Sequence, residues 1–184
     1  MGVAARAQSP VAIAVSTPAD LVAAIGTVNS NPSTNYNLNL VQSIALGEGN
    51  TLPIIDSSAM IVIDGHGNTL SGGGLQRGFV VFSGTVTLQN MTLSNLVASG
   101  GRGGGGGLGA GGALFVNTGS NVRLSNVRFA SNSAAGGPGG GPRGGEGGGG
   151  MGGAGGTGSE TGAGGGGLGI GADGGPAAGG NGHP

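Results

Sequence analysis

The chain has 184 residues and a net charge of −1, and all six of its basic residues are arginine. This charge balance and an aromatic content of 3% argue against nucleic-acid binding, which needs clustered cations or stacking aromatic rings. The lack of cysteine excludes disulfides and thiolate metal sites, and no apolar run approaches the ~20 residues that cross a bilayer.

Residues 1–8 resemble the end of a secretory leader. Ala5, Arg6 and Ala7 make a small-x-small cleavage signal before Gln8, although the basic start and apolar core of a leader are missing. We therefore interpret these residues as the remnant of a leader that begins upstream. The alternative is a chance match in an alanine-rich stretch.

A strand and a helix are expected next. Residues 11–15 alternate large and small apolar side chains, as a short strand does. The helix is predicted over 17–29, because Thr17 is a suitable N-cap, Pro18 suits the first helical position and Asp20 favours the free N–H groups. Its apolar stripe consists of Leu21, Ile25 and Val28.

From residue 36 the pattern changes to very short strand-forming segments separated by glycine, asparagine and serine. They are Tyr36–Leu40, Ile61–Asp64, Phe79–Phe82, Val86–Leu88, Met91–Leu93, Ala113–Val116, Val122–Leu124 and Val127–Phe129. Such short strands are too small for free-standing hairpins, so we expect a solenoid in which each strand stacks on the strand one coil earlier.

An internal repeat supports the solenoid. Residues 86–95 align without gaps on residues 122–131, and both units read apolar-x-apolar-x-Asn-apolar-x-apolar. The phase slips by one residue at Asn90 and Asn126, which predicts that these two asparagines are structural corners between faces. Asparagine tolerates tight turns, and stacked asparagines can hydrogen-bond along the axis.

Glycine dominates the second half, with 39 of the 50 glycines in residues 100–184. A glycine-rich loop is expected over 100–112, and its GGGGLG text recurs at 164–169 without the strand that follows the first copy. We therefore expect the chain to stop inside a longer repetitive architecture. Residues 135–184 carry too few large apolar side chains to offset the entropy of ordering, which predicts a flexible tail.

These motifs resemble a known family. Ile61-Val62-Ile63-Asp64-Gly65-His66-Gly67-Asn68-Thr69-Leu70 resembles a coil common in pectin-lyase-like right-handed β-helices. The segments 77–81 and 84–93, the glycine loop and residues 111–116 resemble the N-terminal passenger region of bacterial autotransporter-type surface proteins. The resemblance covers about residues 9–134. It implies an all-β fold, a right-handed parallel β-helix, in a secreted protein that a C-terminal membrane barrel anchors to the outer membrane.

Asp64 and His66 form the candidate catalytic pair. β-Helix polysaccharide hydrolases resemble this segment in using Gly-His-Gly, but they also need further aspartates on adjacent coils, and Asp56 is the only other acid nearby in sequence. The favoured interpretation is a structural turn at Asp64-Gly65 with His66 facing solvent. Lyase chemistry would need a basic group, for which Arg77, Arg123 and Arg128 are available, although the latter two fit a solvated face better.

The sequence thus predicts a β-helix over 9–134 with a capping helix at 17–29, and no cofactor or metal. The glycine runs lack a phosphate-loop lysine and lack tandem calcium repeats. The predicted function is an adhesin-like structural passenger outside the cell, whose partner is an unidentified host surface or polysaccharide and which itself touches neither nucleic acid nor membrane. The alternatives are a carbohydrate-active enzyme and a glycine-rich surface protein with a functional tail.

Overall fold

The structure is a computed structural model that describes residues 9–139, 149, 153–155, 166 and 174. It consists mostly of strands in parallel sheets, with one short helix. The strands are β1 (Val11–Val15), β2 (Tyr36–Leu40), β3 (Ile44–Ala45), β4 (Ile55–Asp64), β5 (Thr69–Ser71), β6 (Phe79–Ser94), β7 (Val97–Ser99), β8 (Leu114–Val116), β9 (Asn121–Ala130) and β10 (Ser133–Ala135), and the helix is α1 (Pro18–Ser30). The expected leader remnant, 1–8, and most of the expected flexible tail, 135–184, lie outside the described residues.

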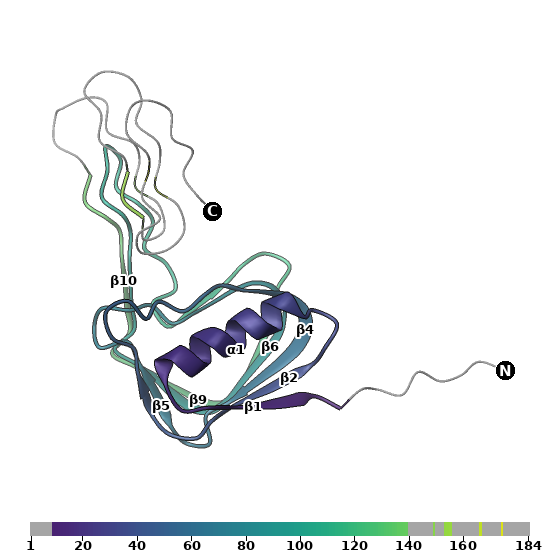
Figure 1. The fold of residues 1–184 in the computed structure, drawn as a ribbon. Helices are drawn as coiled ribbons and strands as arrows, with labels where there is room; N and C mark the ends of the chain where they lie inside the picture. The colour runs from purple at the N-terminus through teal and green to yellow at the C-terminus, as the bar shows by residue number, and fades with distance from the viewer. Residues whose placement is uncertain (1–8, 140–148, 150–152, 156–165, 167–173, 175–184) are drawn as a thin grey trace.

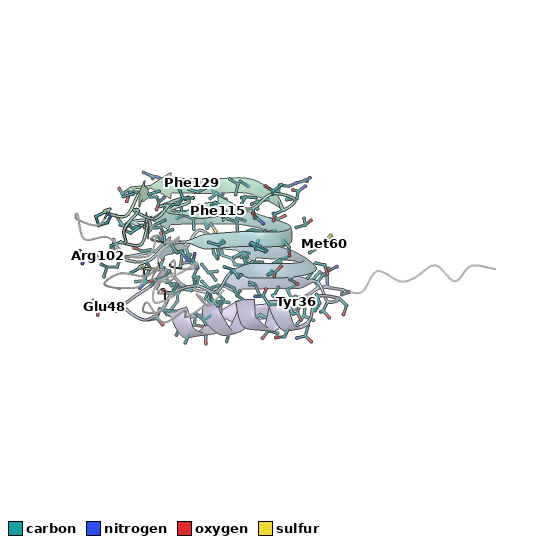
Figure 2. The ribbon with its side chains drawn as sticks, turned by 90° about the horizontal axis from the view of Figure 1, so that it is seen from above. Tyr36, Glu48, Met60, Arg102, Phe115 and Phe129 are labelled. Atoms are coloured by element: carbon teal, nitrogen blue, oxygen red, sulfur yellow. The ribbon has the colours of Figure 1, made fainter. Side chains whose placement is uncertain are left out.

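Eight strands form one curled sheet, in the order β1-β2-β4-β6-β5-β3, with β8 and β9 also paired to β6. β7 and β10 form a second, two-stranded sheet. Every described strand pair is parallel. Figure 1 shows the curled sheet in a view along the stack, and Figure 2 shows the strands as successive layers.

The layers follow one another at a regular spacing along the chain. Val11 pairs with Tyr36, Tyr36 with Ile61, and Ile61 with Val86, so the residue numbers show that these layers have equal lengths. The next step, from Val86 to Val122, is longer. The extra chain length in this layer includes the glycine-rich segment 100–112.

Aliphatic side chains at equivalent positions of successive layers stack into buried columns. Leu38, Ile63 and Leu88 form one column and are at most 1% exposed, while Leu70 and Leu93, which form a second column, are fully buried. Each buried side chain of this size stabilises the fold by about 1.5–3 kcal/mol relative to an exposed one. The core is thus a set of columns that run from layer to layer.

The helix α1 lies across one end of the stack (Figures 1 and 2). Thr17 and Asp20 form a capping box, in which the Asp20 N–H donates to Thr17 Oγ1 and the Asp20 carboxylate accepts from the Thr17 N–H. Its buried face is Leu21, Ala24, Ile25 and Val28, as the apolar stripe predicts. Within the described residues, no helix combines the length and apolarity needed to cross a membrane.

The predicted strand segments lie within strands of the structure, apart from Ala113, but they are shorter than β4, β6 and β9. Three predicted segments between residues 79 and 93 are one bent strand, β6, which turns at Gly84 (φ 89°) and at Asn90 (φ 51°). The short strands β3, β5, β7 and β10 were not predicted, because two or three residues carry no recognisable periodicity. The alignment of 86–95 on 122–131 is confirmed, since Val86, Leu88, Met91 and Leu93 pair with their aligned partners.

The glycine-rich segment 100–112 projects away from the curled sheet, alongside the described residues that follow β10 (Figure 1). The two passages are joined by backbone hydrogen bonds, including Gly100 N–H to Ala135 O at 2.8 Å and Gly137 N–H to Gly107 O at 2.9 Å. A Cβ added at Gly101 would lie 1.6 Å from Gly153 O, so only glycine permits this backbone approach. Side chains therefore contribute little to holding this lobe, which is backbone packed on backbone.

Candidate functional site

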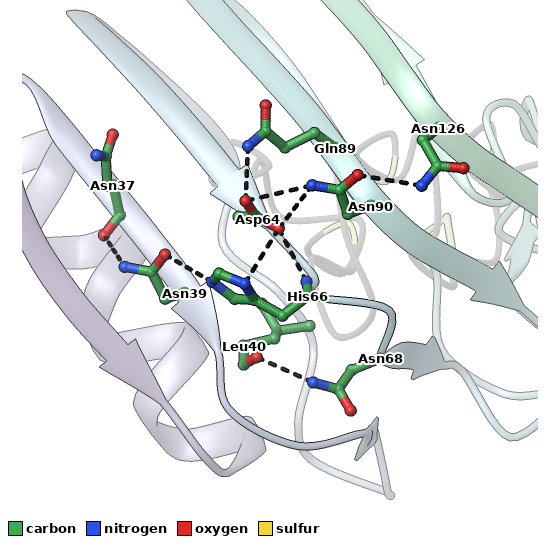
Figure 3. A network of polar contacts seen from close by, with 9 residues as sticks. All are labelled: Asn37, Asn39, Leu40, Asp64, His66, Asn68, Gln89, Asn90 and Asn126. Atoms are coloured by element: carbon green, nitrogen blue, oxygen red, sulfur yellow. Dashed lines mark hydrogen bonds and ion pairs between the residues drawn. The ribbon is translucent and has the colours of Figure 1, made fainter.

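The one extended polar network of side chains that the described residues carry lies at the edge of the columns, where β2, β4, β6 and β9 pass their corners (Figure 3). In-register pairing places Asn39 of β2 beside Asp64 of β4, and Asp64 beside Gln89 of β6. These three residues follow one another at the regular layer spacing. The network therefore exists because parallel strands bring the same position of each layer into line.

The turn after β4 depends on the residue types at Asp64, Gly65 and His66. The His66 N–H donates to Asp64 Oδ1 at 2.8 Å, and His66 itself adopts a left-handed conformation with φ 49°. At Gly65 an added Cβ would lie 2.4 Å from Met91 Cβ and 2.6 Å from Asn90 O in the next layer. Gly65 is thus needed for close approach of two layers, and Asp64 supports the turn through its own side chain.

The carboxylate of Asp64 is engaged by donors from two layers. Gln89 Nε2 donates to Oδ2 at 2.6 Å, and Asn90 Nδ2 lies 3.2 and 3.4 Å from the two carboxylate oxygens. Burial acts to raise the pKa of Asp64, but the hydrogen bonds from Gln89, the His66 N–H and Asn90, with the nearby His66 imidazole, outweigh it and lower that pKa below its ordinary value. Asp64 is accordingly held as an anion that accepts hydrogen bonds.

His66 is oriented by Asn39. The Asn39 amide donates through Nδ2 to Asn37 O at 3.2 Å, which turns its Oδ1 toward His66 Nε2 at 3.0 Å. Oδ1 can only accept, so this contact is a hydrogen bond when Nε2 carries a proton, and Nδ1 lies 3.8 Å from Asp64 Oδ1. The side chain of His66 is 55% exposed, whereas that of Asp64 is 15% exposed.

The sequence-predicted pair therefore lies together, but in a network that contains one carboxylate. Asp56, the other acid near this segment in sequence, accepts a hydrogen bond from Ser83 Oγ instead and takes no part in the network. Glycoside hydrolysis by acid and base groups uses two carboxyl groups about 5–10 Å apart. Among the described residues, no group of three or more His, Cys, Asp or Glu side chains could hold a metal ion.

The two predicted corner residues continue the network toward the far end of the stack. Asn90 and Asn126 have φ values of 51° and 53°, and Asn126 Nδ2 donates to Asn90 Oδ1 at 3.1 Å. A chain of donors thus runs from Asn126 to Asn90 to Asp64. We call these three residues, with Gln89, His66 and Asn39, the polar ladder.

Sequence reasoning missed Asn39 and Gln89. Their signal was that each lies one layer length from Asp64, and this is visible only once the layer length is known. It also missed the burial of Arg77, which is 8% exposed. Within the described part of the chain, Arg77 Nε and Nη1 have no hydrogen-bond partner, and burial lowers the pKa of this guanidinium.

Comparison with protein-family models, with curated proteins and with solved structures finds no match to this chain.

Proposed function

We propose that the chain is a structural passenger of a secreted bacterial surface protein, an adhesin-like scaffold that displays its glycine-rich lobe. The observation that carries the proposal is the layer spacing, which is constant over three steps and longer in the fourth. A repeat that maintains its register while it accommodates an insertion is suited to presenting a segment on a rigid support.

The architecture we propose is a right-handed parallel β-helix, in which each layer is one coil. Parallel pairing of successive strands and aliphatic columns support this assignment. The handedness follows from chirality, since connections between parallel strands of one sheet are right-handed in about 98% of cases. The helix α1 then serves as the cap of the first coil.

The polar ladder supports a structural role over a catalytic one. The Asp64 carboxylate already accepts hydrogen bonds from Gln89, Asn90 and the His66 backbone, so using it as a base would cost these contacts. A ladder of this kind specifies the register of coils, because each donor finds its acceptor only when the layers are correctly aligned.

The proposed contact surface is the lobe at 100–112, and the proposed partner is a polysaccharide or another component of a host surface outside the cell. Arg102 is exposed and Leu108 is 60% exposed, so a cation and a large aliphatic side chain stand out from a backbone that is otherwise glycine and one alanine. Arg102 and Leu108 are therefore the two large side chains of the lobe that a partner could contact.

The test is binding of the labelled chain to immobilised polysaccharides and to host-cell surfaces. We expect the double variant R102S/L108S to lose most of the binding, because Arg102 and Leu108 are the lobe's distinctive contacts. The matched control is E48S/M60S, which removes an exposed charge and an apolar side chain, Met60, that is 59% exposed elsewhere, and it should bind normally. Equal binding by both variants would contradict the proposal.

A carbohydrate-active enzyme is the second candidate, because His66 is half exposed and lies beside Asp64. Release of reducing or unsaturated sugars from the same polysaccharides tests it. Our proposal predicts no turnover by the wild-type chain. Turnover that both Asp64→Asn and His66→Ala abolish would replace the structural passenger with an enzyme.

A further inference from the structure

The end of the stack opposite α1, where Figure 2 labels Phe129, exposes apolar residues whose partners in the layer below are buried. Leu124 and Phe129 of β9 are 45% and 46% exposed, whereas Leu88 and Leu93, their partners in the layer below, are fully buried. Val122 and Val127 are partly buried against the same core. The columns therefore end at β9 in an apolar surface, which we call the β9 face.

The β9 face also ends a sheet. Among the described strands, β9 pairs only with β6, so its outer side carries backbone N–H and C=O groups that no described strand meets. Such an edge is a template for a further strand. All described pairs are parallel, and β9 bends at Asn126 with φ 53°, so a strand that continues this pattern runs in the same direction and bends at the same position.

The polar ladder is unfinished at this end. Asn126 donates to Asn90, and Asn90 donates to Asp64, but no described residue donates to Asn126 Oδ1. Asn126 Oδ1, the acceptor at the end of this row of hydrogen bonds, could accept from the Nδ2 group of one more asparagine. The incoming strand is thus expected to carry an asparagine in register with Asn126.

Two exposed arginines of β9 indicate which charges the incoming strand carries. Arg123 and Arg128 are exposed on β9, and their neighbours in the layer below are Thr87 and Thr92. Neither arginine makes an ion pair with a described residue. Carboxylates placed directly opposite them on a new strand would form two favourable cross-strand pairs.

Two other occupants fit this surface poorly. A second copy that paired β9 with β9 in an antiparallel, fully overlapped register would place Arg123 opposite Arg128 at two positions, which is unfavourable. The remaining sequence of the chain, 140–184, has only Met151, Leu168 and Ile170 as sizeable apolar residues, so it contains no segment with the required spacing of four apolar positions around an asparagine.

We infer that the β9 face binds an extended acidic segment of a partner polypeptide, which adds as a parallel strand. This segment places apolar side chains over Leu124 and Phe129, an asparagine over Asn126 and carboxylates opposite Arg123 and Arg128. The inference concerns a surface distinct from the glycine-rich lobe.

A labelled ten-residue peptide tests the inference by fluorescence anisotropy with the full chain. Its sequence is that of residues 86–95, the strand that already pairs with β9, with T87E and T92E. The matched control peptide carries T87K and T92K. We expect the acidic peptide to bind at least about fivefold more tightly, as two cross-strand charge pairs would give.

Protein variants separate the contributions of charge, ladder and apolar surface. The charge reversal R123E/R128E should exchange the preference, so that the lysine peptide binds more tightly. Phe129→Ser should remove binding, whereas Phe82→Ser, at a phenylalanine with the same 46% exposure outside this face, should leave it unchanged. Asn126→Ala should weaken binding of the acidic peptide.

Three outcomes would overturn the inference. They are the absence of saturable binding by the acidic peptide, equal binding of the two peptides, and self-association of the chain through β9 that excludes the peptide. Sedimentation of the chain with and without Phe129→Ser detects the last of these, since a β9-mediated dimer would dissociate in this variant.

Discussion

The two ends of the layered core differ in what covers the last apolar residues. At one end α1 covers the first layers, and Leu21 and Ile25 of its buried face are at most 1% exposed. At the other end Leu124 and Phe129 project from β9 and are nearly half exposed. The interior layers between them bury equivalent side chains completely.

This difference shows how a stack of parallel layers can be closed. A helix of 13 residues satisfies its own backbone hydrogen bonds and offers one apolar stripe, so it covers the columns and adds no sheet edge beyond that of β1. A strand such as β9 covers the layer below but leaves a new edge and a new apolar surface. Each layer therefore depends mainly on its two neighbours.

The largest expected effect compares two leucines of one column. Leu88→Ala removes a fully buried side chain with a layer on both sides, and should lower the free energy of unfolding by about 2–5 kcal/mol. Leu124→Ala removes a side chain that is 45% exposed, and should cost less than about 1 kcal/mol. Urea unfolding of the full chain measures both.

Equal losses of unfolding free energy in Leu88→Ala and Leu124→Ala would contradict the proposed difference between the two ends. A large loss in Leu124→Ala would mean that the β9 face is already covered in solution. Ile63→Ala, in the same column one layer nearer α1, is the control and should behave like Leu88→Ala.

The second prediction concerns the anionic centre of the polar ladder. Asp64→Asn replaces an acceptor of charge-assisted hydrogen bonds with an amide, and should cost about 1–3 kcal/mol at neutral pH. Because the pKa of Asp64 is lower in the folded chain than in the unfolded chain, this contribution is complete above the ordinary aspartate pKa of about 3.9.

The contribution is then lost as the pH falls from about 4 through the lower folded-state pKa. Unfolding of the wild-type chain and the Asp64→Asn variant, measured side by side from neutral to acid pH, should give a difference that shrinks only in this acidic range. Effects of the other carboxyl groups cancel in the comparison. A difference that stays constant throughout would show that hydrogen bonds to the Asp64 anion do not stabilise the fold.

Some features could be predicted from sequence because their signals are local. The helix was found from Thr17, Pro18 and Asp20, because their preferences for the start of a helix need only adjacent residues. The pairing of β6 with β9 was found because residues 86–95 and 122–131 share both the apolar pattern and the corner asparagine. The first layers share only the apolar character of positions such as Tyr36 and Ile61, so their regular period is not visible as repeated text.

The candidate site was predicted only in part, for the same reason. Asp64 and His66 lie in one turn and could be recognised together, but Asn39 and Gln89 come from neighbouring layers and depend on register. The burial of Arg77 was equally hidden, because Gln76-Arg77-Gly78 reads as a polar loop. The sequence alone did not show which residues of adjacent layers lie next to each other along the stack axis.

The smallest expected effect compares the two corner asparagines. Both have positive φ values, so replacement by alanine costs each about 1–2 kcal/mol of backbone strain. Asn90 also donates to the Asp64 carboxylate, whereas Asn126 donates to a neutral amide at the exposed end. Asn90→Ala should therefore be more destabilising than Asn126→Ala by about 1 kcal/mol.

Glycine at the same positions isolates the side-chain contribution, because it adopts positive φ without strain. Asn126→Gly is expected to be nearly neutral, and Asn90→Gly should retain the cost of about 1 kcal/mol for the lost bond to Asp64. If Asn126→Gly cost as much as Asn90→Gly in urea unfolding, the end of the ladder would be as constrained as its middle. This result would indicate that the β9 end of the stack is covered, as α1 covers the other end.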